Sequence, residues 1–335
     1  MATILSPRSV GRVPPGRIRE EGFTLVEVLS ALVILAIAMT AAYATFQFQH
    51  ASFTVQSRVG EAQQNLRAAV EVLSRDIRLA GYGIPAGTQI KLPDGVLPSG
   101  DNTIRTLSPR NRTTGADNLC LIYRYDMDAG MPPTELANGM GAYTDVMNVD
   151  SASGYAQGDL VMVTNDLAAD LFEVTSVAAP TLNHSVGGSA NQYNSVGAHS
   201  LWPGGGYAVD STVSKVRFVC YFVDDVTDPA HPTLMLDRMN GAAAQPLADD
   251  IEDLQVEYGL DTNGDFVIDS WTPSPSSAQL SQVKQLGLFL SARTRMPERG
   301  WQGFRPALSD RAAGPADGYR RRTLDNVAID LRNPG

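Results

Sequence analysis

The stretch GFTLVE at residues 22–27, with the apolar run 28–46 directly after it, decides the fold of this 335-residue chain. About 24 residues from Phe23 onward are enough to cross a bilayer as a single helix. A basic leader precedes the stretch, as is typical of the cytoplasmic side of a membrane helix, and it holds Arg8, Arg12, Arg17 and Arg19. Glu27 is the one charged residue of the predicted helix, and a carboxylate at the bilayer centre costs roughly 2.5 to 3.5 kcal/mol. The sequence therefore predicts a membrane anchor in which the carboxylate of Glu27 has a functional role.

The helical pattern continues beyond the apolar run and becomes amphipathic. Apolar residues recur at spacings of three and four, while charged and polar residues fill the other side. A helix from Thr24 to Ala80 would be about 85 Å long at 1.5 Å per residue, and the GYGIP sequence at residues 81–85 ends it. The rest of the chain has to cover the apolar stripe, which consists of Val55, Val59, Ala62, Leu66, Ala69 or Val70, Leu73, Ile77 and Ala80.

The remainder, residues 83–335, predicts a β-rich head without a second long helix. Apolar or alternating runs separated by Gly, Pro, Asn and Ser clusters are typical of strands. These runs are 118–125, 160–164, 171–177, 213–223, 254–260, 266–271, 283–292 and 327–331, and we expect irregular surface loops at 83–117 and 184–206. The predicted fold is α+β, with one long N-terminal helix packed on an antiparallel sheet.

Composition limits the classes of partner. With 43% hydrophobic residues the chain can bury a substantial core. Without the first 22 residues it carries 22 basic and 34 acidic residues, a net charge of −12, which does not suit nucleic acid. Its two cysteines, Cys120 and Cys220, both lie in the part expected outside the cytoplasm, where an oxidising compartment allows a disulfide. Two buried free thiols are the alternative.

The GFTLVE stretch and its apolar run resemble the processing signal of type IV prepilins and type II secretion pseudopilins. The resemblance implies a prepilin peptidase and methyltransferase that cleaves between Gly22 and Phe23 and methylates the new amino group of Phe23. It also implies that Glu27, at the fifth mature position, pairs with the N-terminal amine of a neighbouring subunit in the filament core. Two alternatives stay open, a plain signal anchor and a secretory signal cleaved after Ala44.

Three further segments are similar to minor pilins of the PilW type. They are residues 73–82, residues 246–265 and residues 327–333. Relatives often place a cysteine after the Gly-Tyr turn, whereas Gly83 stands here, so the family's disulfide pattern does not transfer. J-type pseudopilins of type II secretion share much of this plan and stay an alternative, as does a ligand-binding or adhesive head on a pilin anchor.

The resemblance implies a function and an organisation. The chain is expected to be a non-enzymatic subunit that joins, and helps to initiate, a type IV pilus with other minor pilins, the major pilin and a tip adhesin. Residues 1–22 would be the leader, 23–46 the membrane and filament-core helix, 47–82 the amphipathic half, and 83–335 the periplasmic head. Before assembly the protein would be a single-pass inner-membrane protein, and afterwards it would lie in the pilus or at the cell surface.

Catalytic motifs do not emerge from the sequence. There is no Gly-x-Ser-x-Gly elbow and no phosphate-binding loop. The histidines His50, His184, His199 and His231 are scattered, and none has a His or Cys at metal-ligand spacing. We therefore expect no enzyme activity and no required cofactor.

One segment has oxygen ligands at the spacing of a calcium loop. Its side chains are Asp261, Asn263, Asp265 and Asp269, with the carbonyl of Val267 completing the set. Phe266 occupies the position where such loops have glycine, and no glutamate follows at the twelfth position. The alternative is a two-residue hairpin turn at Asn263-Gly264 without an ion.

Overall fold

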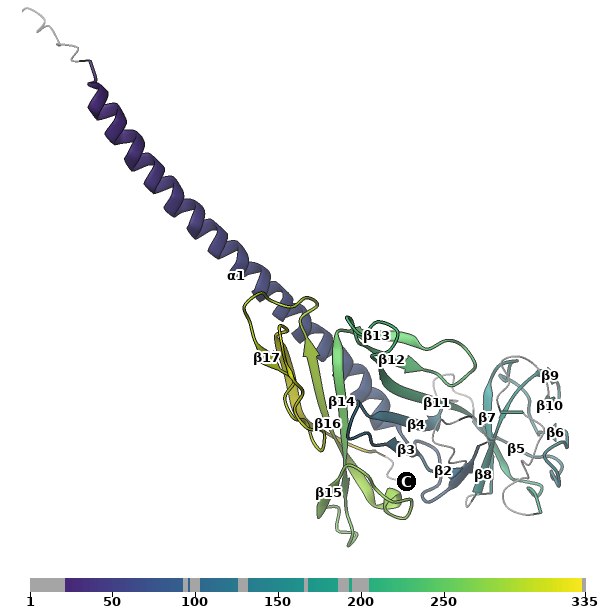
Figure 1. Ribbon diagram of the computed structural model, residues 1–335. Coiled ribbons are helices and arrows are strands. Elements are labelled where there is room, and N and C mark those ends of the chain that lie inside the picture. Colours follow the sequence, from purple (N-terminus) through teal and green to yellow (C-terminus); the bar gives the residue numbers. More distant parts are fainter. Residues whose placement is uncertain are drawn as a thin grey trace, which may run out of the picture. The chain divides into compact units, whose positions relative to one another are not determined.

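The computed structural model describes residues 22–92, 96, 103–125, 132–165, 168–185, 193–194 and 205–332. They form one long α-helix and a set of β-sheets, so the predicted α+β class is confirmed (Figure 1). The chain divides into two compact units, Met1–Thr54 and Val55–Gly335, which we describe separately. The leader arginines, His199 and most of the predicted loop 184–206 lie outside the described residues.

The helix α1 spans Leu25–Leu79, within one residue of the prediction at each end. Thr24 caps its start: the Glu27 N–H donates to Thr24 Oγ1 at 3.3 Å, and the Glu27 carboxylate accepts the Thr24 N–H and hydroxyl, both at 2.9 Å. This reciprocal capping box satisfies two donors at the helix end. The capping box therefore fixes where α1 begins in the uncleaved chain.

In the second unit, α1 buries the stripe that its periodicity predicts. Ala62, Leu66, Ala69, Leu73 and Ile77 are each at most 2% exposed, and they share one core with both large sheets. The helix ends where Gly81 adopts a φ of 72°, a left-handed conformation that glycine accommodates without strain. The amphipathic half of α1 thus forms part of the core of the head.

One buried residue of α1 was not predicted. Asp76, 3% exposed, lies beside the apolar stripe. Its carboxylate accepts the Tyr221 hydroxyl at 2.6 Å and the Arg75 Nε–H at 3.2 Å. A hydrogen-bonded anion is tolerated where an unpaired one is not, so Tyr221 and Arg75 account for its burial.

The largest sheet is built around β11 (Thr212–Asp224). Its main order is β13-β12-β11-β7-β8-β1-β2, with β3, β4 and β5 attached at its side. The other strands are β1 (Gln89–Lys91), β2 (Thr103–Ile104), β3 (Leu107–Arg110), β4 (Asn118–Arg124), β5 (Thr134–Glu135), β7 (Leu160–Thr164), β8 (Ala168–Glu173), β12 (Thr233–Asp237) and β13 (Gln245–Asp249). The pair β1·β8 is parallel, so the expectation of purely antiparallel pairing is wrong at this point.

A second sheet has the order β15-β14-β16-β19. Its strands are β14 (Ile251–Leu260), β15 (Ser270–Thr272), β16 (Val283–Arg293) and β19 (Arg321–Asp330), and a short 3₁₀ helix, η2 (Gln279–Gln282), precedes β16. Two small sheets pair β6 (Met147–Asn148) with β10 (Thr181–Asn183) and β9 (Ser176–Ala178), and β17 (Gly303–Phe304) with β18 (Ala316–Asp317). Buried side chains of β14 and β16 belong to the same core as the buried stripe of α1.

Several predicted elements differ from the structure. The run 171–177 belongs to two strands, β8 and β9, and the segment 83–117 contains β1, β2 and β3 instead of being irregular throughout. Most of the predicted strand 266–271 is loop, because β15 begins at Ser270. β12 and β13 were missed altogether.

A buried carboxyl joins the two large sheets. Asp117, 2% exposed, donates its N–H to the Leu254 carbonyl at 2.7 Å. Its carboxylate accepts the N–H groups of Arg112 at 2.8 Å and Val256 at 2.9 Å. Burial raises the pKa of Asp117 from 3.8 to about 7, against the lowering effect of the two N–H donors.

The raised pKa of Asp117 predicts a pH dependence of stability. Because the folded-state pKa exceeds the unfolded one, this carboxyl stabilises the fold fully below about pH 4 and loses that contribution as the pH rises through about 7. The loss amounts to at most about 4 kcal/mol. We expect the free energy of unfolding, measured by denaturant titration, to fall with pH more steeply in the wild type than in Asp117→Asn. Parallel curves for the two proteins would contradict this assignment.

Candidate functional site

The predicted cleavage point lies outside the helix. Residues 22–24 precede α1, and the Phe23 side chain is 87% exposed. A methyl group added to Gly22 would meet no atom within 4 Å. The fold itself therefore places no demand for glycine at this position.

The apolar half of α1 is uncovered within its own unit. All of its residues up to His50 are exposed, including Leu29, Leu32, Val33 and Ile37. Among the described residues, α1 is the one helix long and apolar enough to cross a membrane. Such a surface is stable only when lipid or other protein covers it.

The structure pairs the two cysteines. Cys120 of β4 and Cys220 of β11 face each other directly in the sheet, and their sulfur atoms are 2.01 Å apart. Of the two alternatives that the sequence left open, the structure therefore has the disulfide.

The disulfide gives a prediction about thiol content and stability. We expect no alkylation when the unfolded protein is treated without reduction, and two labels after reduction, as counted by mass spectrometry. Because the bond closes a loop of 100 residues, the chain-entropy model gives a stabilisation of roughly 4.7 kcal/mol. A matched Cys120→Ser, Cys220→Ser variant should therefore unfold at a much lower denaturant concentration. Two labelled thiols in the unreduced protein would contradict the pairing.

The segment proposed for calcium is a nine-residue loop, 261–269, between β14 and β15. The two-residue hairpin turn predicted at Asn263-Gly264 is therefore wrong. Asp261 accepts the N–H groups of Gly264 at 2.6 Å and Phe266 at 3.0 Å, and Phe266 has a φ of 66° where calcium loops have glycine.

The remaining oxygens of the loop also accept hydrogen bonds from it. Asp265 accepts the Val267 N–H at 2.8 Å, and Asp269 accepts the N–H and hydroxyl of Thr262 at 2.7 and 2.6 Å. These bonds, with the hydroxyl as the leading cause, lower the pKa of Asp269. In the part of the chain that the structure describes, no three His, Cys, Asp or Glu side chains gather as a metal site would need. Calcium binding stays a prediction.

Calcium binding at this loop predicts a ligand-dependent melting temperature. At a hundredfold excess over the dissociation constant, bound Ca²⁺ would stabilise the fold by about 2.7 kcal/mol, and Asp265→Ala would remove the effect. The measurement is thermal unfolding of the full chain in detergent with Ca²⁺ or with chelator. Identical melting temperatures in the two conditions would contradict calcium binding and would mean that the loop is held by its own hydrogen bonds alone.

The histidines that the structure describes lie apart. His184 Nε2 is 2.8 Å from the Asp145 carbonyl oxygen, and burial lowers the pKa of this imidazole. His231 Nδ1 is 3.0 Å from the Asp250 carboxylate. His50 belongs to the exposed half of α1. His184 and His231 are thus held by local contacts, and none of these three described histidines is assembled with a nucleophile.

A buried ion network that was not predicted from the sequence lies on β14. Asp253 is fully buried, and its two oxygens lie 2.8 Å from Arg305 Nη1 and 2.7 Å from Arg311 Nη1. Gln255 donates to the same carboxylate at 2.9 Å. Both arginines come from the long connection between β16 and β19, so the network attaches this connection to the sheet.

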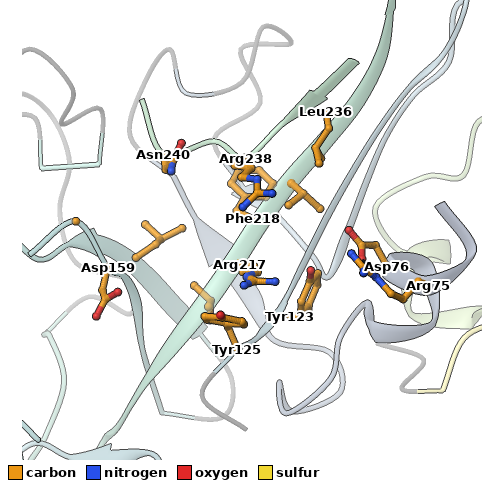
Figure 2. A pocket seen from close by; sticks show the side chains of 14 residues that line it. Arg75, Asp76, Tyr123, Tyr125, Asp159, Arg217, Phe218, Leu236, Arg238 and Asn240 are labelled. Atoms are coloured by element: carbon orange, nitrogen blue, oxygen red, sulfur yellow. Dashed lines mark hydrogen bonds and ion pairs between the residues drawn. The ribbon is translucent and has the colours of Figure 1, made fainter. Parts of the chain in front are cut away.

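A cavity of about 170 Å³ lies beside the C-terminal part of α1 (Figure 2). Three arginines and two tyrosines contribute to its wall: Arg75, Arg217, Arg238, Tyr123 and Tyr125. This site could not be predicted from the sequence because these five residues come from α1, from the end of β4 and the residue after it, from β11 and from the segment after β12.

Together, a helix that is apolar in its first half and amphipathic in its second, and a β-sheet head, have the layout of pilins. Residues 17–43 match the family model of the prokaryotic N-terminal methylation motif, and residues 220–333 match that of type IV pilus-assembly protein W, PilW. These matches support a type IV pilus-related pilin, and the resemblance to PilW-type minor pilins is confirmed. Neither match covers residues 44–219, so the resemblance at residues 73–82 stays a prediction. No curated protein and no solved structure matches the chain significantly.

Proposed function

We propose that this pilin is a minor subunit that is cleaved between Gly22 and Phe23, methylated at Phe23 and assembled into a type IV pilus. The observation that carries the proposal is the uncovered apolar half of α1 directly behind the methylation motif. An apolar helix of this length can lie in the membrane before assembly and among other pilin helices afterwards. The two locations need the same surface, so one helix serves both.

Glu27 has one role before cleavage and a different role after it. In the uncleaved chain its carboxylate bonds Thr24 at the helix start. Cleavage creates a charged amine at Phe23, one residue before Thr24. We propose that Glu27 then pairs with the Phe23 amine of a neighbouring subunit, because each charge offsets the cost of burying the other in the fibre.

The proposed organisation follows from this role. Residues 1–22 are the removed leader, 23–46 the membrane and filament-core helix, 47–82 the amphipathic half and 83–335 the periplasmic head. The partners are the prepilin peptidase, other minor pilins, the major pilin and a tip adhesin. The match to a pilus-assembly protein supports a role in initiation, and it supports a structural subunit over an enzyme.

Fibre counting tests the initiation role. In a host with its other pilins intact, deletion of this gene should reduce the number of fibres per cell while the remaining fibres keep normal length. The chain itself should occur in sheared fibres in much smaller amounts than the major pilin. An unchanged fibre number with a loss of protein secretion would favour the secretion pseudopilin. An unchanged fibre number with a loss of surface attachment would favour the adhesive head.

A further inference from the structure

The strand β11 has a gap on one of its edges. On the edge opposite β4, β7 pairs as far as Lys215, opposite Val161, and β12 begins at Cys220, opposite Asp237. Residues 216–219 therefore lie between two strand ends, and no strand of the described residues pairs with them there. A gap in the middle of a sheet is unusual because it leaves main-chain groups without a ladder partner.

The hydrogen bonds of β4 show which groups face the gap. Ile122, opposite Phe218, donates its N–H to the Thr106 carbonyl at 3.1 Å, and its carbonyl accepts the Gly81 N–H at 2.9 Å. Both bonds point away from β11, so Phe218 and Ile122 are a pair without mutual hydrogen bonds. The N–H and C=O of Phe218 therefore point toward the gap.

The arginine-lined cavity lies at this gap. It is bordered by residues 158–160 at the start of β7, by residues 216–219 of β11 and by Leu236, Arg238 and Asn240 at and after the end of β12. In the view of Figure 2, Arg217 and Tyr125 lie along β11 and Asp159 lies to one side of them, while Tyr123 lies between Arg217 and the residues Asp76 and Arg75 of the helix. The main-chain groups of Phe218 and the guanidinium groups thus border one hollow.

Among the described residues, the carboxylates at the cavity are already paired. Asp159 is paired with Lys215 at 2.6 Å, and Asp76 is held by Arg75 and Tyr221. Arg217 stacks on Tyr125, with its guanidinium carbon 3.3 Å from the ring centre.

The two remaining guanidinium groups of the cavity are those of Arg217, which also interacts with Tyr123, and of Arg238. Within the described part of the chain, no carboxylate forms an ion pair with Arg217 or with the exposed Arg238. These two charges stand in a chain whose net charge is −10.

We propose that this cavity binds the carboxylate of a Glu or Asp side chain carried on an extended segment of a partner protein. Guanidinium groups match carboxylates through paired hydrogen bonds. The volume of about 170 Å³ is below the roughly 300 Å³ at which small-molecule sites begin, so it suits one side chain better than a free ligand. The N–H and C=O of Phe218 can pair with the main chain next to that side chain, as in strand addition. Such a segment would bind whether or not the chain enters a pilus.

Peptide binding to the full mature chain in zwitterionic detergent tests the site. The probes are a terminally blocked pentapeptide with one central glutamate between valines, its glutamine counterpart, and free glutarate. Calorimetry should show that the glutamate peptide binds about tenfold more tightly than the glutamine peptide, as expected for a charge-assisted hydrogen bond. Raising the salt concentration should weaken the binding of the glutamate peptide but not that of the glutamine peptide.

Arginine variants locate the binding. Arg238→Gln and Arg217→Gln should each lower the affinity for the glutamate peptide about tenfold. Arg299→Gln, which removes an equal charge from an exposed loop, should change this affinity less than twofold. Because Arg238 is exposed, its variant keeps the test valid even if loss of the Arg217 stacking destabilises the fold. Equal binding of both peptides, or wild-type affinity in Arg238→Gln, would overturn the proposal. Glutarate that binds as tightly as the peptide would assign the cavity to small organic acids instead.

Discussion

A Gly22→Ala variant is expected to accumulate as the uncut precursor in the membrane. The fold leaves open space at Gly22, so the added methyl group should not disturb the chain itself. The effect should arise in the peptidase, which has to accommodate this residue at the cut. One extra methyl group in a tight pocket costs roughly 10- to 200-fold in rate, enough for immunoblots of membranes to show almost no mature chain.

Glu27→Ala provides the matched comparison. This variant should be cut at the wild-type rate but enter fibres poorly, because the buried amine of Phe23 loses its counter-charge. A simple anchor would show neither effect. Normal cleavage of Gly22→Ala, or normal incorporation of Glu27→Ala into sheared fibres, would contradict the proposed roles.

Asp253→Asn should cause a large loss of stability. The substitution keeps the volume but removes the negative charge between Arg305 and Arg311, and it leaves two largely buried guanidinium groups without their counter-ion. Breaking a buried ion pair in this way costs roughly 3 to 5 kcal/mol. We expect denaturant unfolding of the full chain in detergent to show this decrease in the free energy of unfolding.

Asp249→Asn is the control for Asp253→Asn. Asp249 has a 61% exposed side chain and lies 3.9 Å from Arg295, so its loss should cost less than about 1 kcal/mol. Equal effects of the two substitutions would show that the buried network does not hold the connection between β16 and β19.

The helix could be predicted from the sequence because its signals are local. A three- and four-residue repeat of apolar side chains marks the buried stripe, and glycines mark its end. The burial of Asp76 could not be predicted, because its partner Tyr221 lies 145 residues away. The same holds for the cavity, whose arginines come from α1, from β11 and from the segment after β12 and meet only in the folded chain.

The missed strands and the misread loop also have physical reasons. β13 contains Pro246, which reads as a strand breaker but is tolerated at the edge of a sheet. The dipeptide Asn263-Gly264 favoured a tight turn. In the structure, Asp261 accepts hydrogen bonds from two main-chain N–H groups and so stabilises a wider loop. Side-chain hydrogen bonds of this kind compete with the turn that the dipeptide favours.

The mass and N-terminal residue of the chain isolated from host membranes test the central claim most directly. The pilin assignment predicts a mature protein that begins with N-methylated Phe23 and retains the whole of α1. A chain that begins at Thr45, or one that keeps its leader in cells that process their major pilin, would contradict it.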